Sequence, residues 1–191
     1  MKCLYVLALA ILIDAVTGEP TRKPWIWFHP TVWVGVTAER AKPLLKGGGN
    51  LAERVKGALF VALISAAAFL FAIILPSFLS RFSEIASMIT ASILLKTSFS
   101  IRFLLEKVWS VYKSLKTGNL NGARGELKFL VRRNVKVLGS GHLASAAIES
   151  CAESLVDGFI SPLLYFSLFG PAGAFLQRAI NTLDSVSYTH L

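Results

Sequence analysis

The feature that most constrains this chain is the unbroken apolar run ALFVALISAAAFLFAIIL at Ala58–Leu75. Its 18 residues carry no charge, and about 20 such residues suffice for a helix to cross a bilayer. Only 16% of the 191 residues are charged, whereas soluble domains carry about a quarter, and 54% are hydrophobic. We therefore predict an all-α, polytopic integral membrane bundle that occupies residues 1–191 as a single domain.

Three other segments are expected to join a helix at 58–79 in this bundle. The run at 3–16 is short and contains Asp14; we interpret it as a retained first span, with a cleaved signal peptide as the alternative. A short turn then leads into a helix at 83–97, which completes a hairpin. The third segment, 159–176, is interrupted by glycine and proline, and we expect a broken or re-entrant helix there.

Positive charge is concentrated in two segments. Seven of the 20 Lys and Arg residues lie in 22–56, and ten lie in 96–136. Basic loops beside apolar spans mark the cytoplasmic side and attract anionic lipids. We therefore expect both segments in the cytoplasm, and the 76–84 turn and the amino terminus outside. No nucleic-acid partner is expected, because such a binder would present a basic face with exposed aromatics on a soluble fold.

The two basic segments differ in their predicted structure. Residues 18–57 are rich in Pro, Trp and Gly, which predicts a loop whose three tryptophans lie at the level of the lipid headgroups. Residues 96–115 have apolar side chains at helical spacing with Lys and Arg between them, which predicts an amphipathic cytoplasmic helix. Residues 116–134 predict a turn followed by a second basic helix.

Three carboxylates, Glu149, Glu153 and Asp157, precede the broken segment at spacing i, i+4, i+8. On a helix they share one face and repel one another. A solvated helix face is one interpretation. The other is a cation or substrate site, because ionised side chains beside a membrane segment are costly and usually functional. Mg²⁺ takes one or two carboxylates together with phosphate oxygens, so Glu153 and Asp157 are its candidate ligands.

A second polar group follows the break. Arg178, Asn181 and Ser185 lie at i, i+3, i+7 and share a helix face, with Asp184 near its edge. The guanidinium of Arg178 suits a phosphate or a carboxylate, whereas a helix end with capping polar groups is the purely structural alternative. If both polar groups serve one site, they converge on one pocket, with the 14–30 segment nearby.

Residues 147–185, AIESCAESLVDGFISPLLYFSLFGPAGAFLQRAINTLDS, resemble the signature region of the CobD/CbiB family of membrane-bound adenosylcobinamide-phosphate synthases. The motif DAVTGEP and a following HP resemble the opening motif of that family, and LAERVKGAL and LLKTS come in the expected order. The resemblance covers about residues 4–185. Glu19 stands where the family usually has Asp, and Ser154 where Asn is common. Residues 186–191 form an atypical tail, so we expect a truncated form of the family sequence.

The resemblance implies an ATP-dependent, amide-forming ligase of cobalamin biosynthesis in the prokaryotic cell membrane. Its substrates would be adenosylcobyric acid, which is the corrinoid, and an aminopropanol phosphate or related amino-alcohol phosphate, with ATP and Mg²⁺ required. It implies catalytic roles for the carboxylates Glu149, Glu153, Asp157 and Asp184. It implies substrate-binding roles for Asp14, Glu19, His29, Arg178 and Asn181.

The rival interpretation is a non-enzymatic membrane protein, either a transporter or a structural subunit, whose acidic residues bind cations. A transporter would be expected to show inverted repeats, and the sequence shows none.

Overall fold

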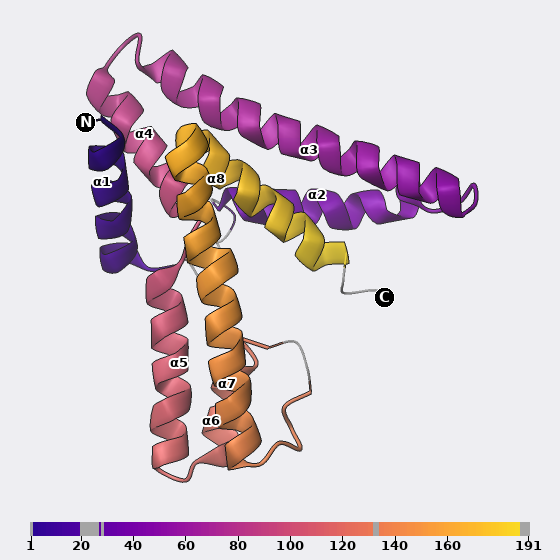
Figure 1. Cartoon of the computed structure of the whole chain (residues 1–191), viewed down its shortest axis with the longest axis vertical. Coiled ribbons are helices and arrows are strands. Elements are labelled where there is room, and N and C mark those ends of the chain that lie inside the picture. Colours follow the sequence, from indigo (N-terminus) through magenta and orange to yellow (C-terminus); the bar gives the residue numbers. More distant parts are fainter. Residues whose placement is uncertain (1, 20–26, 28, 132–133, 188–191) are drawn as a thin grey trace.

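The computed structural model describes residues 2–19, 27, 29–131 and 134–187, and this part of the chain is helical with no β-strand (Figure 1). The predicted all-α class is therefore confirmed. In chain order the elements are α1 Lys2–Thr17, α2 Pro30–Leu45, α3 Asn50–Leu79, α4 Glu84–Lys96, α5 Ile101–Lys116, α6 Leu120–Leu127, α7 Ser140–Leu155, the π-helical turn η2 Val156–Ile160, and α8 Ser161–Ser187.

Three helical segments are long and apolar enough to cross a membrane: Asn50–Leu79, Glu84–Lys116 and Ser140–Val186. They confirm the membrane class by length and composition. The most apolar window, in α3, is only 11% buried inside the protein, so most of its surface suits lipid. The helix predicted at 3–16 is present as α1, but it is not one of the three segments. Its 16 residues rise only about 24 Å, less than the ~30 Å of a hydrocarbon core.

The predicted membrane hairpin is formed by α3 and α4. α3 starts at Asn50, earlier than predicted, because the charged residues of its first turns also fit a helix. One of them, Glu53, accepts a hydrogen bond from the main-chain N of Gly47 over 2.6 Å and closes the preceding turn. α4 starts after Ser83, whose hydroxyl oxygen accepts a hydrogen bond from the Ala86 N over 3.3 Å.

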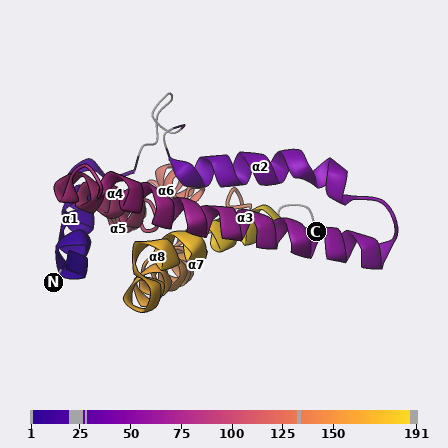
Figure 2. The same ribbon diagram turned by 90° about the horizontal axis from the view of Figure 1, so that it is seen from above.

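The loop predicted over 18–57 is wrong for its central part, where α2 is a helix that runs beside α3 (Figure 2). Pro30 begins α2, since the missing N–H of proline costs nothing in the first turn of a helix. The helix packs against α8 and α3, with Ala38 buried and Val34 against their shared core. Tertiary packing thus overrides the turn-forming composition. Of the three tryptophans expected at the headgroups, Trp25 lies outside the described residues.

Helices α5, α6 and α7 form an arm that projects away from the remaining helices (Figure 1). The arm has its own apolar core, made of Val111, Ala123, Leu127, Val135, Leu143, Ala146 and Ala147. α5 is amphipathic as predicted, because Leu104 and Val111 are buried while Lys113 and Lys116 are exposed. A second core lies between α1, α4 and α8 and contains Val6, Ala10, Ala91, Leu95, Phe99, Phe166 and Ala174.

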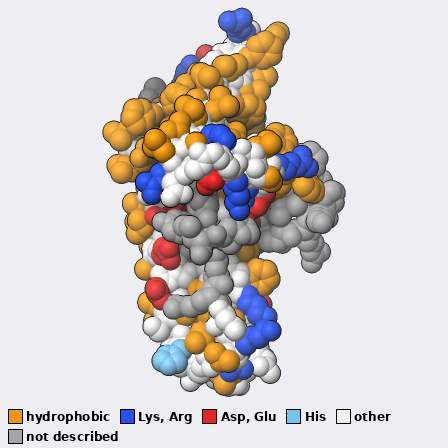
Figure 3. Space-filling model, turned by 90° about the vertical axis from the view of Figure 1, so that its right-hand side faces the viewer, with side chains coloured by type: hydrophobic (Ala, Val, Ile, Leu, Met, Phe, Trp, Pro, Cys, Tyr) orange, Lys and Arg blue, Asp and Glu red, His pale blue; other side chains and the backbone are white. Residues whose placement is uncertain are grey.

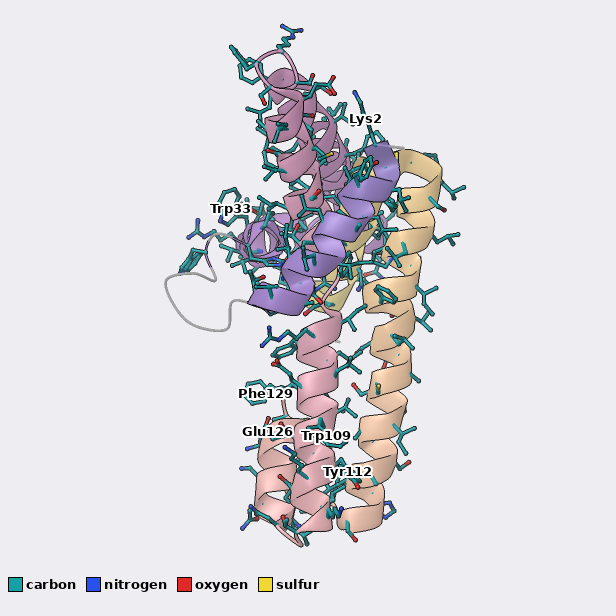
Figure 4. All side chains as sticks on the ribbon, turned by 90° about the vertical axis from the view of Figure 1, so that its left-hand side faces the viewer. Lys2, Trp33, Trp109, Tyr112, Glu126 and Phe129 are labelled. Carbon is teal, nitrogen blue, oxygen red and sulfur yellow. The ribbon has the colours of Figure 1, made fainter. Side chains whose placement is uncertain are left out.

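Lys107 of α5 donates a hydrogen bond to Glu126 near the end of α6. Glu126 and Phe129 lie beside α5 (Figure 4). The Nζ of Lys107 lies 2.9 Å from Glu126 Oε2 and 4.1 Å from the centroid of the Phe129 ring. Trp109 and Tyr112 stack on the exposed side of α5, with their ring centroids 5.1 Å apart. The contacts of Lys107 with Glu126 and Phe129 therefore hold α5 against the end of α6.

The second basic helix predicted within 116–134 is shorter than expected, because α6 ends at Leu127. Beyond this point the chain is drawn toward α7, since the hydroxyl of Ser150 donates a hydrogen bond to the main-chain oxygen of Leu130 over 2.7 Å. The segment around Leu130 thereby comes to lie over the polar face of α7.

The broken helix predicted at 159–176 is confirmed, and its break is at Gly170. This glycine has φ 66° and ψ −160°, a backbone region that is essentially reserved for glycine. Pro171 begins the second limb of α8 and does not interrupt a continuous helix. After the break the second limb turns back beneath α3 (Figure 1). Small side chains allow this close approach: Ala68 and Ala72 of α3 share a core with Ala172 and Ala179 of α8.

Candidate functional site

A polar cavity of about 720 Å³ lies where α7, η2 and the second limb of α8 meet. Six residues predicted to form one pocket line it together, namely Glu149, Glu153, Asp157, Arg178, Asn181 and Asp184. Leu130 and Val131 form part of its wall. Hydrophobic side chains dominate the upper part of the molecule, whereas acidic and basic side chains gather in its middle and lower parts (Figure 3). The six residues predicted to share a pocket are therefore brought together in one cavity.

The acidic row retains its common face across a change of helix type. Glu149 and Glu153 belong to α7, whereas Asp157 lies in η2, and all three side chains are exposed at the cavity wall. Among the described residues, no three His, Cys, Asp or Glu side chains are grouped closely enough to hold a metal ion. The row therefore fits Mg²⁺ in one way: one or two carboxylates, completed by phosphate oxygens and water.

Arg178 lies at the inner side of the cavity, and its Nε is buried without a hydrogen-bond partner in the described structure. No described carboxylate lies within ion-pair distance of its guanidinium. Arg178 therefore has unused donors, which suit an anionic ligand group.

A second polar cluster is buried where α1 and α4 end. It contains Asp14 at the end of α1, then Glu19 and His29, and Lys96 at the end of α4. Lys96 Nζ lies 2.8 Å from Glu19 Oε1 and 3.7 Å from Asp14 Oδ1. The other oxygen of Asp14, Oδ2, accepts a hydrogen bond from the main-chain N of Arg102 over 3.1 Å. The predicted residues Asp14, Glu19 and His29 thus come together.

His29 belongs to the second cluster through its contact with Glu19. Its Nε2 is 3.4 Å from Glu19 Oε2, and its Nδ1 is 2.6 Å from the hydroxyl of Thr31. Burial is the main cause that lowers the pKa of His29 below its ordinary value of 6.5. Glu19 opposes this shift of the pKa, whereas the positive charges of Lys96 and Arg178 add to it. His29 is therefore neutral at pH 7 and presents an imidazole that donates from one nitrogen and accepts at the other.

Lys96 is the residue of this cluster that the sequence interpretation missed. Its side chain is only 7% exposed, and it ends a helix whose last residues are otherwise apolar or small. The available signal was LLKTS, in which a lysine directly follows two buried leucines. A lysine in that setting needs a carboxylate partner, since a buried unpaired charge is strongly destabilising.

The fold and this site define an α-helical membrane protein that has three helical segments long and apolar enough to cross a bilayer and a polar cavity beside them. The chain belongs to the CobD/Cbib protein family, whose family model matches residues 7–189. The resemblance found in the signature region and in the opening motif is thereby confirmed.

Curated relatives agree with this assignment. "Probable cobalamin biosynthesis protein CobD" of Thermoplasma acidophilum is 39% identical over 184 residues, which is 95% of this chain and 57% of the relative. The protein of the same name from Pyrococcus abyssi is 39% identical over 97% of this chain and 60% of the relative. "Cobalamin biosynthesis protein CobD" of Dehalococcoides mccartyi is 32% identical over 97% of this chain and 59% of the relative. The chain thus spans less than two thirds of the length of these relatives. No solved structure matches it.

Proposed function

We propose that this chain acts in cobalamin biosynthesis, as part of a membrane enzyme that forms an amide bond between adenosylcobyric acid and an aminopropanol phosphate with consumption of ATP. One observation carries the proposal. In a chain of the CobD/Cbib family, the carboxylates of α7 and η2 and the polar residues of α8 line a single cavity of about 720 Å³. A cavity of this size is typical of small-molecule sites.

The substrates differ in how they fit this cavity. An amino-alcohol phosphate is small enough to enter whole, whereas a corrinoid with its nucleoside ligand is larger and would present only its reacting propionate. The phosphate group would bind the guanidinium of Arg178, whose Nε has no hydrogen-bond partner among the described residues, with Asn181 beside it on the same helix face. This arrangement orients the amine toward the acidic row.

Amide formation needs an activated carboxylate and a neutral amine. The propionate oxygen attacks the terminal phosphorus of ATP and ADP leaves; the amine nitrogen then attacks the acyl carbon of the acyl phosphate, and inorganic phosphate leaves. The attacking nitrogen begins as an ammonium, so one proton must pass to a base, and an exposed carboxylate of the row, Glu149, Glu153 or Asp157, is suited to take it. Glu153 and Asp157 would also hold Mg²⁺, which when bound supplies positive charge to the phosphoryl oxygens.

The location follows from the same proposal. ATP is available in the cytoplasm, so the cavity faces the cytoplasmic side of a prokaryotic cell membrane, and the basic segments around it face anionic lipid. The return of α8 after Gly170 permits this arrangement, because it brings Arg178 and Asp184 back to the level of Asp157.

The test is an assay with membranes that contain either this chain or a form extended to the length of its relatives. Each is incubated with adenosylcobyric acid, aminopropanol phosphate and Mg-ATP, and the corrinoid product is identified by mass spectrometry. We expect a mass increase equal to one aminopropanol phosphate minus one water, dependent on ATP. Absence of this product with the extended form would refute the proposal.

A further inference from the structure

A second cavity, of about 390 Å³, adjoins the cavity that the acidic row lines. Ser154, Arg178 and Asn181 line both of them, so ligands bound in the two cavities would meet at these residues. We refer to the first as the acidic cavity and to the second as the basic cavity.

The two cavities differ in the charge of their walls. Four carboxylates and Arg178 line the acidic cavity. Among the described residues that line the basic cavity, Lys128 and Arg178 are charged, and no carboxylate is present. A ligand group with several negative charges is repelled by the acidic wall and attracted by the basic one, since the Coulomb energy of close charges is large at a partly desolvated surface. The basic cavity therefore suits a polyanion.

Both cations of the basic cavity have donors for such a ligand. Lys128 directly follows α6, its side chain is exposed, and it forms no ion pair with a described carboxylate. Its ammonium is therefore available to a phosphate group. The Nε of Arg178 is buried without a hydrogen-bond partner in the described structure. A guanidinium has five N–H donors, so Arg178 can contact phosphate groups in both cavities.

Phe129, the residue after Lys128, adds an aromatic surface to the basic cavity. The residue is 63% exposed, although Lys107 Nζ lies 4.1 Å from the centroid of its ring. Exposed aromatic rings stack on nucleobases and tolerate any base, because every base has a π-face. A lysine, an arginine and an exposed ring around one polar cavity together match the phosphates and the base of a nucleotide.

We propose that the basic cavity is the nucleoside triphosphate site, with the polyphosphate between Lys128 and Arg178 and the base against Phe129. This proposal rests on the proposed function, which consumes ATP. The amino-alcohol phosphate then occupies the acidic cavity, where its ammonium faces the carboxylates. The two substrates reach Arg178 from different cavities, and the terminal phosphoryl group of the nucleotide lies at the shared residues.

The experiment measures ligand binding to the purified chain in lipid nanodiscs by isothermal titration calorimetry, with no corrinoid present. The ligands are Mg-ATP, inorganic triphosphate with Mg²⁺, and aminopropanol phosphate. The variants are Lys128→Met, Lys128→Arg and Phe129→Leu. Lys136→Met is the matched control, because Lys136 is also exposed, forms no ion pair with a described carboxylate and lines neither cavity.

We expect Lys128→Met to weaken the binding of Mg-ATP and of inorganic triphosphate about tenfold, the effect of losing one charge-assisted hydrogen bond. Aminopropanol phosphate should bind this variant within about threefold of the unmodified chain, since it occupies the other cavity. Phe129→Leu should weaken Mg-ATP about fivefold or more and leave inorganic triphosphate within about twofold, because only ATP has a base to stack. Lys128→Arg and Lys136→Met should bind all three ligands within about threefold of the unmodified chain.

Mg-ATP binding by Lys128→Met equal to that of Lys136→Met would overturn the proposal, and so would an unmodified chain that binds no Mg-ATP. Equal losses of Mg-ATP and aminopropanol phosphate binding in Lys128→Met would overturn the division into two cavities. Unchanged Mg-ATP binding by Phe129→Leu would overturn the assignment to a nucleotide.

Failure of this proposal and failure of the proposed function are distinguishable, because the binding measurements need no amide synthesis. An extended form that yields the corrinoid product, with an apparent affinity for ATP that Lys128→Met does not change, would overturn the nucleotide site and leave the proposed function in place. The expected binding series together with an extended form that yields no product would refute the proposed function and leave the nucleotide site in place.

Discussion

Gln177 donates a hydrogen bond from its Nε2 to the main-chain oxygen of Asp157 over 3.4 Å. The two residues are 20 positions apart and lie on opposite sides of the break at Gly170. The bond therefore ties the second limb of α8 to η2, at the point where the two polar groups of the cavity meet. A straight helix from Asp157 would place Gln177 about 30 Å away, so this contact depends on the return of α8.

Substitution of the glycine at the break should destabilise the fold. Gly170→Ala places a Cβ on a residue with φ 66°, and no atom lies within 4 Å of that Cβ, so the cost comes from the backbone alone. We expect a loss of about 1–3 kcal/mol in the free energy of unfolding, measured by denaturant titration in mixed micelles.

Gly57→Ala is the matched control for this substitution. Gly57 lies inside the apolar helix α3, also with open space around its Cβ, and alanine there should be neutral or stabilising by about 0.5–1 kcal/mol. Equal effects of the two substitutions would show that Gly170 is not the residue that turns α8.

Neutralising the acidic row should reduce turnover without preventing membrane insertion. Glu153→Gln and Asp157→Asn are each made in an active form that is extended to the length of the curated relatives. Each should lower the rate of amide formation by about 10²–10⁴-fold, the usual contribution of a positioned acid or base. Glu126→Gln on α6 is the control, since Glu126 pairs with Lys107 outside the cavity. Normal turnover in both cavity variants would remove these carboxylates from the mechanism.

The direction in which α8 returns can be tested by cysteine labelling in sealed vesicles. With Cys3 and Cys151 replaced by Ala, Ser185→Cys should react with an impermeant maleimide from the same side as Ser145→Cys on α7. Ser80→Cys in the turn after α3 should react from the opposite side. Reaction of Ser185→Cys only from the side that labels Ser80→Cys would contradict a shared cytoplasmic cavity.

His29 should make the stability of the protein depend on pH. Its pKa is lowered in the folded state by burial, so between pH 6.5 and the folded-state pKa the unfolded chain takes up a proton first. Stability is therefore fully present above about pH 6.5 and is lost as the pH falls through the folded-state pKa.

The measurement is the thermal unfolding midpoint in detergent between pH 7.5 and pH 5. We expect the unmodified chain to lose stability over this range more steeply than His29→Asn. His142→Asn, on the exposed side of α7, should follow the unmodified chain. If His29→Asn and the unmodified chain gave parallel profiles, burial of the imidazole would not control this dependence.

The sequence predicted those parts of the fold in which composition alone decides the structure. Long uncharged runs have few alternatives to a membrane helix, which is why α3 and α4 were predicted. The break in α8 was predicted because glycine and proline interrupt its apolar run. The helix α2 was missed because its Pro, Trp and Gly content indicates a loop, whereas contacts with α3 and α8 stabilise it. Such contacts come from residues far apart in the chain, and a periodicity argument does not reveal them.

In the candidate site too, local sequence patterns predicted some residues, whereas contacts between distant parts of the chain were not predicted. Glu149, Glu153 and Asp157 were found because helical spacing places them on one face, and Arg178 because it follows the break in an otherwise apolar segment. Lys96 offers only the weak local signal of a lysine that follows two leucines, and its carboxylate partners lie 77 and 82 positions away in the sequence.

The π-helical turn η2 sets how far α8 is rotated relative to α7 about the helix axis. This rotation matters because the polar surface of α7 and the apolar surface of α8 point in different directions. A π turn holds one residue more than an α turn over the same rise, and one α-helical residue corresponds to a rotation of about 100°. The polar stripe of α7 and the lipid-facing stripe of α8 are offset by this extra residue. Deletion of a single residue in Val156–Ile160 would therefore remove only one side chain and leave the hydropathy profile nearly unchanged. It would nevertheless rotate the carboxylates of α7 relative to α8, and within this family the length of that turn should vary less than its sequence.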